Sequence, residues 1–352
     1  MKIGGFEISS GGAVYIIAEI GVNHDGDVGR ALELIDAASD AGADAVKFQY
    51  FRTDRLMSAA ARLAAYQKSA GESDPFSMLR RLELAAGGLA RCVERAHVRG
   101  VHAIVTVFSL ELVEEMRSIA WDAYKTASPD IIHQPMLEAL ARTERPMIVS
   151  TGASNAEEVA RCAAWVRGWG AEARTAFLHC VSSYPTAPED TTLGAMRDVS
   201  RLVAPMDVGY SDHTRGVGTG RDAVSMGARI LEKHLTYDRG AKGPDHAASL
   251  DPVMFGEYVA LARSAAGHSP DPVLIGADRK RVLECERDVR TVSRQSIVWA
   301  RQMAPGEVVT RERVTFKRPG TGIEPFRLHE VIGRRVARAV DSDMPAVWED
   351  VA

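Results

Sequence analysis

The stretch YIIAEIGVNHDGD, residues 15–27, runs from an apolar segment straight into Glu19, Asn23, His24 and Asp25. Its first part is rich in the β-branched and aromatic residues that favour a strand. A buried glutamate is costly unless it has a partner, and few structural segments place so many polar groups where a strand ends. The stretch therefore predicts a β-strand whose carboxyl end carries chemistry.

The same pattern recurs along the chain, with amphipathic segments such as ALELIDAASDAG, residues 31–42, between the apolar runs. Eight strands that alternate with helices over about 250 residues predict an α/β fold, the (β/α)8 TIM barrel. A short hairpin before residue 15 is expected to close the bottom of the barrel. The expected strands are Tyr15–Ile20, Ala45–Tyr50, Ala103–Phe108, Ala123–Thr126, Met147–Ser150, Ala176–Val181, Asp207–Tyr210 and Ile230–His234.

The composition and hydrophobic pattern of the sequence divide the chain into three parts. Residues 1–275 form the predicted barrel, and residues 276–290 are strongly charged and are interpreted as a linker. Residues 291–352 contain short β-like runs separated by the turn signals APGE and RPGTG, which predict a small, mostly β domain. Acidic residues interleave with the arginines from Arg279 to Arg301, so this stretch is expected to be a solvated, salt-bridged surface.

The overall charge points to a small-molecule partner. The 352 residues include 43 Lys and Arg against 47 Asp and Glu, a net charge of −4. This balance gives no field that would attract nucleic acid or a membrane surface, and no apolar run reaches the roughly 18 residues of a membrane span. The four cysteines are scattered without CxxC pairing, which favours a reduced, cytoplasmic location.

Polar residues follow most of the predicted strands, where active sites of barrels form. Two lysines together with several hydroxyls suit a phosphate and a carboxylate, which need several donors at once. Ion pairs with Glu19 and Glu232 are an alternative explanation for the lysines, and capping or core packing for the histidines. A pair of imidazoles that does bind a metal leaves positions open for water and substrate. The residues are Lys47, Gln49, Thr106, Lys125, Ser128, Ser150, Ser182, Ser211, His213 and His234.

Taken together, the motifs AEIGVNHDG, AGADAVKFQ, STGAS, GYSDHT, EKHLT, GPDH and FKRPGTGI resemble the sialic acid synthase family. This family comprises N-acetylneuraminate synthases and their legionaminic and pseudaminic acid relatives, and residues 291–352 are similar to its antifreeze-like (SAF) domain. The resemblance implies condensation of phosphoenolpyruvate with an open-chain N-acetylated hexosamine, N-acetylmannosamine or a modified relative. The products would be a nine-carbon 2-keto acid and phosphate, and the cofactor a divalent metal, Mn²⁺ before Mg²⁺ or Co²⁺.

The resemblance also implies roles for individual residues. His213 and His234 match the metal ligands, while Glu19, Lys47, Lys125 and Asp130 match catalytic groups. It further implies a homodimer in which each antifreeze-like domain caps the partner's barrel, so that Arg318 would be supplied in trans. Lys47, Thr106, Lys125, Ser128, Ser150, Ser182 and Ser211 match residues that bind phosphoenolpyruvate, and Gln49, Tyr184, Asp245 and Arg318 match residues near the sugar.

Several departures from the family pattern leave the identity of the sugar open. Residues 106–108 read TVF where the family commonly has TPF, and Asp130 stands where a glutamate is usual. His133 and Ser182 each replace an asparagine that is common in neuraminate enzymes. Two other functions remain as alternatives: a Schiff-base aldolase that uses Lys125 or Lys47, and an inactive barrel that serves binding or assembly.

Overall fold

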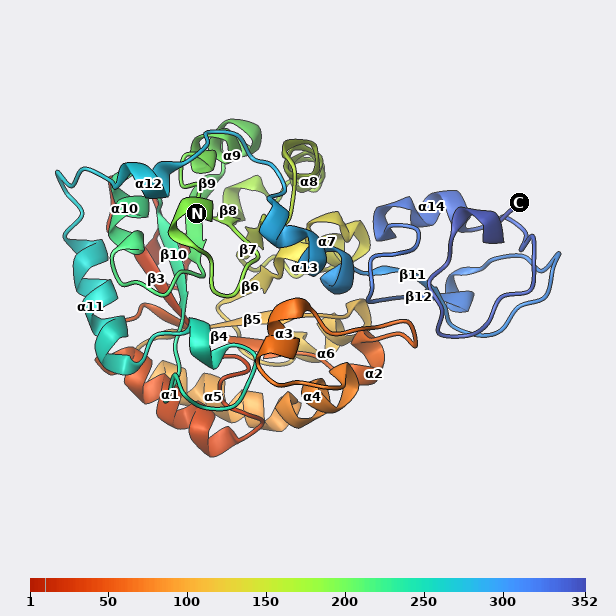
Figure 1. Cartoon of the computed structure of the whole chain (residues 1–352), viewed down its shortest axis with the longest axis horizontal. Coiled ribbons are helices and arrows are strands. Elements are labelled where there is room, and N and C mark those ends of the chain that lie inside the picture. Colours follow the sequence, from red (N-terminus) through yellow and green to blue (C-terminus); the bar gives the residue numbers. More distant parts are fainter. Residues whose placement is uncertain (10) are drawn as a thin grey trace.

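A closed barrel of eight parallel strands forms the centre of the computed structural model, which describes residues 1–9 and 11–352. Neighbours in the barrel are neighbours in sequence, and the last strand closes against the first (Figure 1). This arrangement confirms the predicted (β/α)8 barrel. The strands are β3 (Tyr15–Glu19), β4 (Ala45–Tyr50), β5 (His102–Val107), β6 (Ala123–Thr126), β7 (Met147–Ser150), β8 (Thr175–Cys180), β9 (Asp207–Asp212) and β10 (Ile230–His234).

Helices surround the barrel, and the connection from β4 to the next long helix carries three short ones that were not predicted. Asn155 caps α8, because its side chain accepts from Glu158 N while the Glu158 carboxylate accepts from Asn155 N. The outer helices are α1 (Val28–Asp40), α5 (Ala86–Val98), α6 (Val113–Arg117), α7 (Gln134–Ala141), α8 (Ala156–Gly168), α9 (Ala195–Val203), α10 (Thr219–Ser225) and α11 (Pro252–Arg263). The shorter ones are α2 (Thr53–Leu56), α3 (Ala65–Ser69), α4 (Pro75–Leu82) and α12 (Pro272–Ile275).

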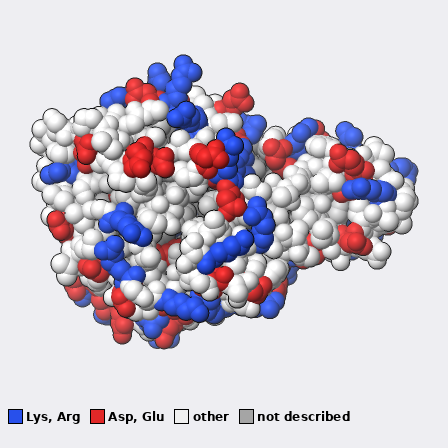
Figure 2. All heavy atoms as spheres, viewed as in Figure 1, with Lys and Arg blue, Asp and Glu red and all other residues white. Residues whose placement is uncertain are grey.

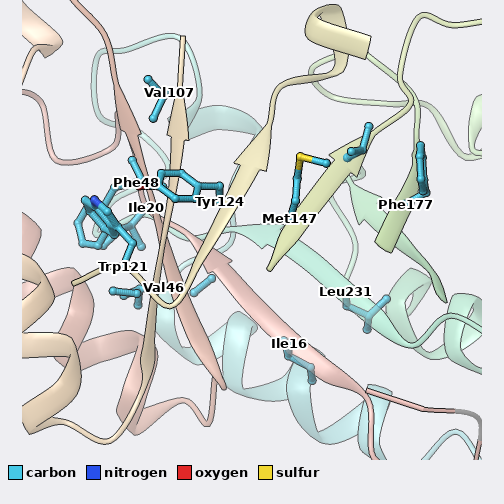
Figure 3. Packing of buried hydrophobic residues seen from close by; sticks show 14 of the residues in the cluster. Ile16, Ile20, Val46, Phe48, Val107, Trp121, Tyr124, Met147, Phe177 and Leu231 are labelled. Carbon is cyan, nitrogen blue, oxygen red and sulfur yellow. The ribbon is translucent and has the colours of Figure 1, made fainter. Parts of the chain in front are cut away.

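Side chains alternate between the two sides of each strand, as strand geometry requires. Outward-facing residues such as Val46, Phe48 and Leu231 pack in the main core between the strands and the helices (Figure 3). The lower interior holds a second apolar cluster that includes Ile17, joined by Ile3 and Ile8 from the N-terminal segment. In that segment β1 (Lys2–Ile3) pairs with β2 (Phe6–Glu7), which confirms the predicted hairpin at the bottom.

The C-terminal region lies to one side of the barrel beyond α13 (Arg287–Ser293) (Figure 1). Strands β11 (Ser296–Trp299) and β12 (Val314–Lys317) pair antiparallel, and a short helix, α14 (Leu328–Val331), follows. These elements enclose their own apolar core, so the prediction of a small, mostly β region is confirmed. We call residues 294–352 the cap.

The charged segment after the barrel is only partly the solvated surface expected from the sequence. Glu284 and Arg287 form an exposed ion pair, as expected. Lys280, Glu286 and Arg294, however, are only 4%, 0% and 6% exposed, and both Arg290 and Arg294 bind Glu158 of α8 in bidentate fashion, at 2.7–2.9 Å. For these buried residues the prediction was wrong, because their partners lie far away in the sequence, on the barrel.

Elsewhere the surface follows the balanced composition. Figure 2 shows Lys and Arg interspersed with Asp and Glu over both the barrel and the cap on the viewed face. Across residues 1–9 and 11–352, none of the helices combines the length and the apolar character that crossing a membrane requires.

Replacing Glu158 with glutamine should destabilise the fold by about 3 kcal/mol at neutral pH, since the buried guanidinium of Arg294 and the partly buried one of Arg290 would lose their carboxylate. The two arginines outweigh burial and lower the pKa of Glu158 to about 2. A depressed carboxyl pKa stabilises the folded state above the unfolded pKa of about 4.3, and that stabilisation fades as pH falls toward 2. Urea unfolding of both proteins from pH 7 to pH 3 should show the difference shrinking; a constant difference would mean that charge is not the cause.

Candidate active site

The inward-facing residues change from apolar to polar toward the carboxyl ends of the strands, so the apolar floor gives way to a buried polar layer. This layer and the loops above it line one pocket. The pocket includes nearly every strand-end residue that the sequence singled out. From the strands themselves come Glu19, Lys47, Gln49, Thr106, Lys125, Ser150, Cys180, Ser211, Glu232 and His234.

Each of the two lysines in the pocket has a carboxylate and a hydroxyl as partners. Lys47 forms an ion pair with Glu19 and donates to Thr106 Oγ1 at 3.2 Å. Lys125 lies 3.4 Å from Glu232 and donates to Ser150 Oγ at 2.7 Å. The ion pairs considered as an alternative explanation are therefore present, and they lie on the wall of the pocket, where a ligand can reach them.

The electrostatics of the four charged groups follow from burial and pairing. Burial raises the pKa of Glu19 to about 7, although Lys47 acts in the opposite direction. Burial alone would lower the pKa of Lys47, but the two carboxylates raise it above its usual value. Burial lowers the pKa of Lys125, and the two lysines hold the pKa of Glu232 below its usual range despite burial. The pocket thus combines a carboxyl group that titrates near neutrality with cationic groups.

Hydroxyls form another side of the pocket. Ser128 Oγ accepts from Gly152 N at 3.1 Å, and Ser211 Oγ donates to Glu232 at 2.9 Å. A Cβ atom at Gly152 would lie 2.3 Å from Ser182 Oγ and 2.6 Å from Ser128 Oγ. Only glycine therefore lets these two hydroxyls approach the same point, which suits an anion with several oxygens.

His213 and His234 line the pocket with ring centroids 5.5 Å apart. His213 Nδ1 lies 2.8 Å from the Val181 carbonyl, which can only accept, so in the neutral imidazole Nδ1 carries the proton and Nε2 has the lone pair. His234 Nδ1 is buried without a hydrogen-bond partner among the described residues, 3.7 Å from Asp245. This donor set of two imidazoles and a nearby carboxylate fits a divalent metal such as Mn²⁺, although the described residues include no cluster of three such ligands.

The residues expected near the sugar also line this pocket. Gln49 donates to Glu19 at 3.3 Å, and Tyr184 packs on His213 with ring centroids 4.2 Å apart. Burial raises the pKa of Asp245 to about 6. Arg318 is placed over the Phe108 ring at 5.4 Å, and its Nε is buried without a hydrogen-bond partner in the described part of the chain.

Asp130 does not belong to the pocket wall. The 3₁₀ helix η2 (Ser128–Ile132) turns it toward Gln295 of the C-terminal region, at 3.5 Å. Burial raises its pKa to about 7, with Arg318 acting in the opposite direction. Asn23 and His133 have structural contacts: Asn23 donates to Leu235 O and Ser249, and His133 Nδ1 caps α7.

Sequence reasoning missed several lining residues. Cys180 was not considered, and Glu232 was treated only as an ion-pair partner. Both are inward-facing by strict alternation along β8 and β10, so the period-two pattern could have found them. No comparable signal marked Tyr66 or the apolar wall, which is formed mainly by the β4–α5 connection. That wall consists of Phe51, Leu56, Met78, Leu79 and Leu82.

Within the single chain Arg318 docks against its own barrel, and its supply by a partner subunit in a dimer stays a prediction. Arg318 pairs with Met57 of its own barrel as an isolated bridge. Its N donates to Leu56 O at 2.8 Å, and its carbonyl accepts from Ser58 N at 3.0 Å. The β4–α5 connection therefore provides a docking edge, so the guanidinium reaches the pocket of its own chain.

Comparison with known proteins places this site in a family. The NeuB family profile matches residues 34–269, and the SAF domain profile matches residues 294–352. An N,N'-diacetyllegionaminic acid synthase of Legionella pneumophila is 34% identical over 96% of this chain and 94% of that protein. N-acetylneuraminate-9-phosphate synthase of Homo sapiens is 29% identical over 94% and 90%.

A solved structure agrees over the whole chain. The spore coat polysaccharide biosynthesis protein SpsE of Bacillus subtilis matches with a TM-score of 0.87 and 30% identity, covering 100% of this chain and 99% of that one. Barrel and cap thus occur together in a solved relative that this chain covers almost completely. With its profile match over two thirds of the sequence and these full-length relatives, the chain belongs to the NeuB family and has a SAF domain at its C-terminal end.

Proposed function

We propose that this protein is a phosphoenolpyruvate-dependent nonulosonic acid synthase. It would join phosphoenolpyruvate to the open-chain aldehyde of an N-acetylated hexosamine, with water, and release phosphate and a nine-carbon 2-keto acid. The observation that carries the proposal is the convergence of two buried lysines, several hydroxyls and two imidazoles in one pocket. Membership of the NeuB family supports the same reaction.

In this proposal the lysine and hydroxyl side of the pocket binds phosphoenolpyruvate. Lys47 and Lys125 neutralise its phosphate and carboxylate, and the hydroxyls supply directed hydrogen bonds. Both lysines are held in place by carboxylates before the substrate arrives, so little side-chain entropy remains to be lost on binding. The hydroxyl contacts would come from Thr106, Ser128, Ser150, Ser182 and Ser211.

The hexosamine would lie on the opposite side, where Gln49, Tyr184, Asp245 and Arg318 line the pocket. Arg318 is a fixed fork of donors that can bind two oxygens of the sugar chain at once. His213 and His234 would hold a divalent metal, which supplies Lewis-acid polarisation of the aldehyde when it is bound.

The bond-forming step leaves an electron-poor carbon that groups of the pocket can stabilise. C3 of phosphoenolpyruvate attacks the aldehyde carbon, the aldehyde oxygen takes up a proton, and C2 becomes positively charged. Water then adds to C2 and passes a proton to the Glu19 carboxylate, whose pKa of about 7 suits this exchange. Loss of phosphate from C2 forms the keto group, and Lys47 and Lys125 stabilise the departing anion.

The apolar wall favours a modified hexosamine over N-acetylmannosamine. A hydroxymethyl end pressed against Phe51, Met78 and Leu79 would lose hydrogen bonds to water, whereas a methyl end would not. A pocket of this kind discriminates a hydroxyl from a methyl by about 10²-fold or less. The relative from Legionella pneumophila, at 34% identity, is named for a diacetylated product, N,N'-diacetyllegionaminic acid.

The decisive assay measures phosphate release from phosphoenolpyruvate and Mn²⁺ with a panel of N-acetylated hexosamines, each with a 6-hydroxyl or a 6-deoxy end. Turnover with at least one of them is expected. Covalent trapping of pyruvate by borohydride in place of such turnover would favour the Schiff-base aldolase, and absence of both reactions would favour the inactive barrel.

We further propose that a homodimer exchanges its caps, so that Arg318 enters the pocket of the partner subunit and the docking contacts seen within one chain form between two. Mixing a Lys125→Ala chain with an Arg318→Ala chain under conditions that allow subunit exchange should then restore roughly a quarter of wild-type activity, because each mixed dimer has one pocket that contains both residues. Exchange should be verified with two affinity tags. Verified mixed dimers with no activity above the two parents would contradict the exchanged arrangement.

A further inference from the structure

Two backbone N–H groups from different barrel loops converge on one buried carboxylate oxygen outside the pocket. Glu286 Oε1 accepts from Ala153 N at 2.6 Å and from Ser182 N at 2.8 Å. Glu286 Oε2 accepts from Leu283 N at 2.9 Å. Glu286 belongs to the segment between barrel and cap, yet it is fully buried. One side chain therefore ties together the loops that follow β7 and β8.

Other residues of the same segment hold the same two loops by their carbonyl groups. Lys280 Nζ is buried and donates to Cys180 O at 3.2 Å. Arg290 and Arg294 donate to Ala153 O at 2.5 and 3.2 Å. Ala153 is thus bound at both its N–H and its carbonyl, and the β8 end is bound at both Cys180 and Ser182.

These loops have a conformation that needs such support. Ala153 has φ 49°, a left-handed conformation that residues other than glycine adopt at a cost of about 1 kcal/mol or more. Directly before it, Gly152 approaches the Ser128 and Ser182 hydroxyls so closely that no Cβ would fit. A shift of either loop would move these hydroxyls apart.

We propose that Glu286 is a positioning residue for phosphoenolpyruvate. Its carboxylate fixes the backbone of Ala153 and Ser182, and through them the hydroxyl side of the pocket. Because α13 begins directly after Glu286 and leads into β11 of the cap, the same contacts couple docking of the cap to the phosphoenolpyruvate side. The inference rests on the proposed function for the identity of the ligand; the contacts themselves do not depend on it.

The test compares Glu286→Ala with Glu286→Gln in the full chain. In Glu286→Ala, the KM for phosphoenolpyruvate should rise about tenfold to a hundredfold, as expected for displaced binding groups, while the KM for the hexosamine stays within twofold. Glutamine keeps an oxygen for Ala153 N and Ser182 N, so Glu286→Gln should return the KM to within a few-fold of wild type. A purely structural role would lower the active fraction, hence kcat, and leave both KM values unchanged.

Asp288→Ala is the matched control. Asp288 lies in the first turn of α13, two residues after Glu286, and binds Arg62 and Ala65 N of the barrel from a partly exposed position. It contacts neither loop, so the KM values of this variant should match wild type. If Glu286→Ala does not fold, Lys280→Met, which removes the bond to Cys180 O, should raise the KM for phosphoenolpyruvate in the same selective way. A wild-type KM in the folded variant contradicts the inference alone, whereas absence of turnover by the unmodified protein contradicts the proposed function.

Discussion

Replacement of Glu19 by glutamine is expected to lower phosphate release by about 10²-fold or more while phosphoenolpyruvate affinity changes only a few-fold. Glutamine preserves the shape of the side chain and can still hydrogen-bond to Lys47 and Gln49. It cannot accept a proton from water or stabilise positive charge at C2. The loss should therefore appear in kcat, because the missing interaction belongs to the transition state.

The pH dependence provides a second measurement of the same role. Burial raises the pKa of Glu19 to about 7, so the carboxylate form accumulates as pH rises through 7. If this form accepts the proton, kcat of the unmodified protein should increase from pH 6 to pH 8. The kcat of Glu19→Gln should show no such increase. Glu330→Gln is the control for the change in charge, because Glu330 is a partly exposed carboxylate of α14, paired with Arg327 and located in the cap. Turnover of Glu19→Gln within a few-fold of wild type would show that Glu19 has another role.

The barrel could be predicted because each strand carries its own signal. The apolar runs are short, separated by amphipathic helices, and long enough to fix the register of inward and outward residues. Most boundaries differ by at most one residue from the expected ones, as for β3, which ends at Glu19 and not Ile20. β9 continues to Asp212, two residues beyond the expected end, because its last residues, Ser211 and Asp212, are polar and resemble the start of a loop.

Contacts between distant segments could not be predicted in this way. In sequence, the charged residues around Glu286 look like those of an exposed segment. The contacts of Glu286 with Ala153 and Ser182 arise only when the chain folds. Docking of the cap depends on an edge at residues 56–58 that has no distinctive composition. The resemblance to a family supplied Arg318 as a site residue, but the chain that delivers it is a question of tertiary structure.

Within the pocket, too, some residues could be predicted from the sequence and others could not. Lys47, Lys125 and the histidines could be identified because burying a charged or titratable side chain inside a barrel is costly unless it has a partner or a ligand. Cys180 gave a weaker signal, since a buried cysteine behaves as a small apolar residue. Asp130 came from the family resemblance alone: it lies in η2 and accepts from Gln295, and its catalytic role stays a prediction.

Removal of divalent metal is expected to abolish phosphate release, and addition of Mn²⁺ should restore it. The tautomer of His213 that Val181 O imposes leaves Nε2 available, and His234 stays neutral because burial keeps its pKa well below the usual value. Unchanged release after exhaustive chelation would exclude these two residues as essential metal ligands. His329→Gln on the exposed surface of the cap is the matched control and should respond to chelator and Mn²⁺ as the unmodified protein does.

Affinity for the metal should also depend on pH in a direction that the site dictates. Burial alone would lower the pKa of His213, but Cys180 and Val181 O raise it to about 8 in the metal-free chain. A proton must leave this imidazole before a metal can bind, so the Kd for Mn²⁺ should weaken as pH falls below about 8, approaching tenfold per pH unit. Calorimetric titration of the apo protein with Mn²⁺ at pH 6, 7 and 8 measures this directly. His213→Gln should lose most of both the affinity and its pH dependence, because the other proposed ligand, His234, is already deprotonated over this range.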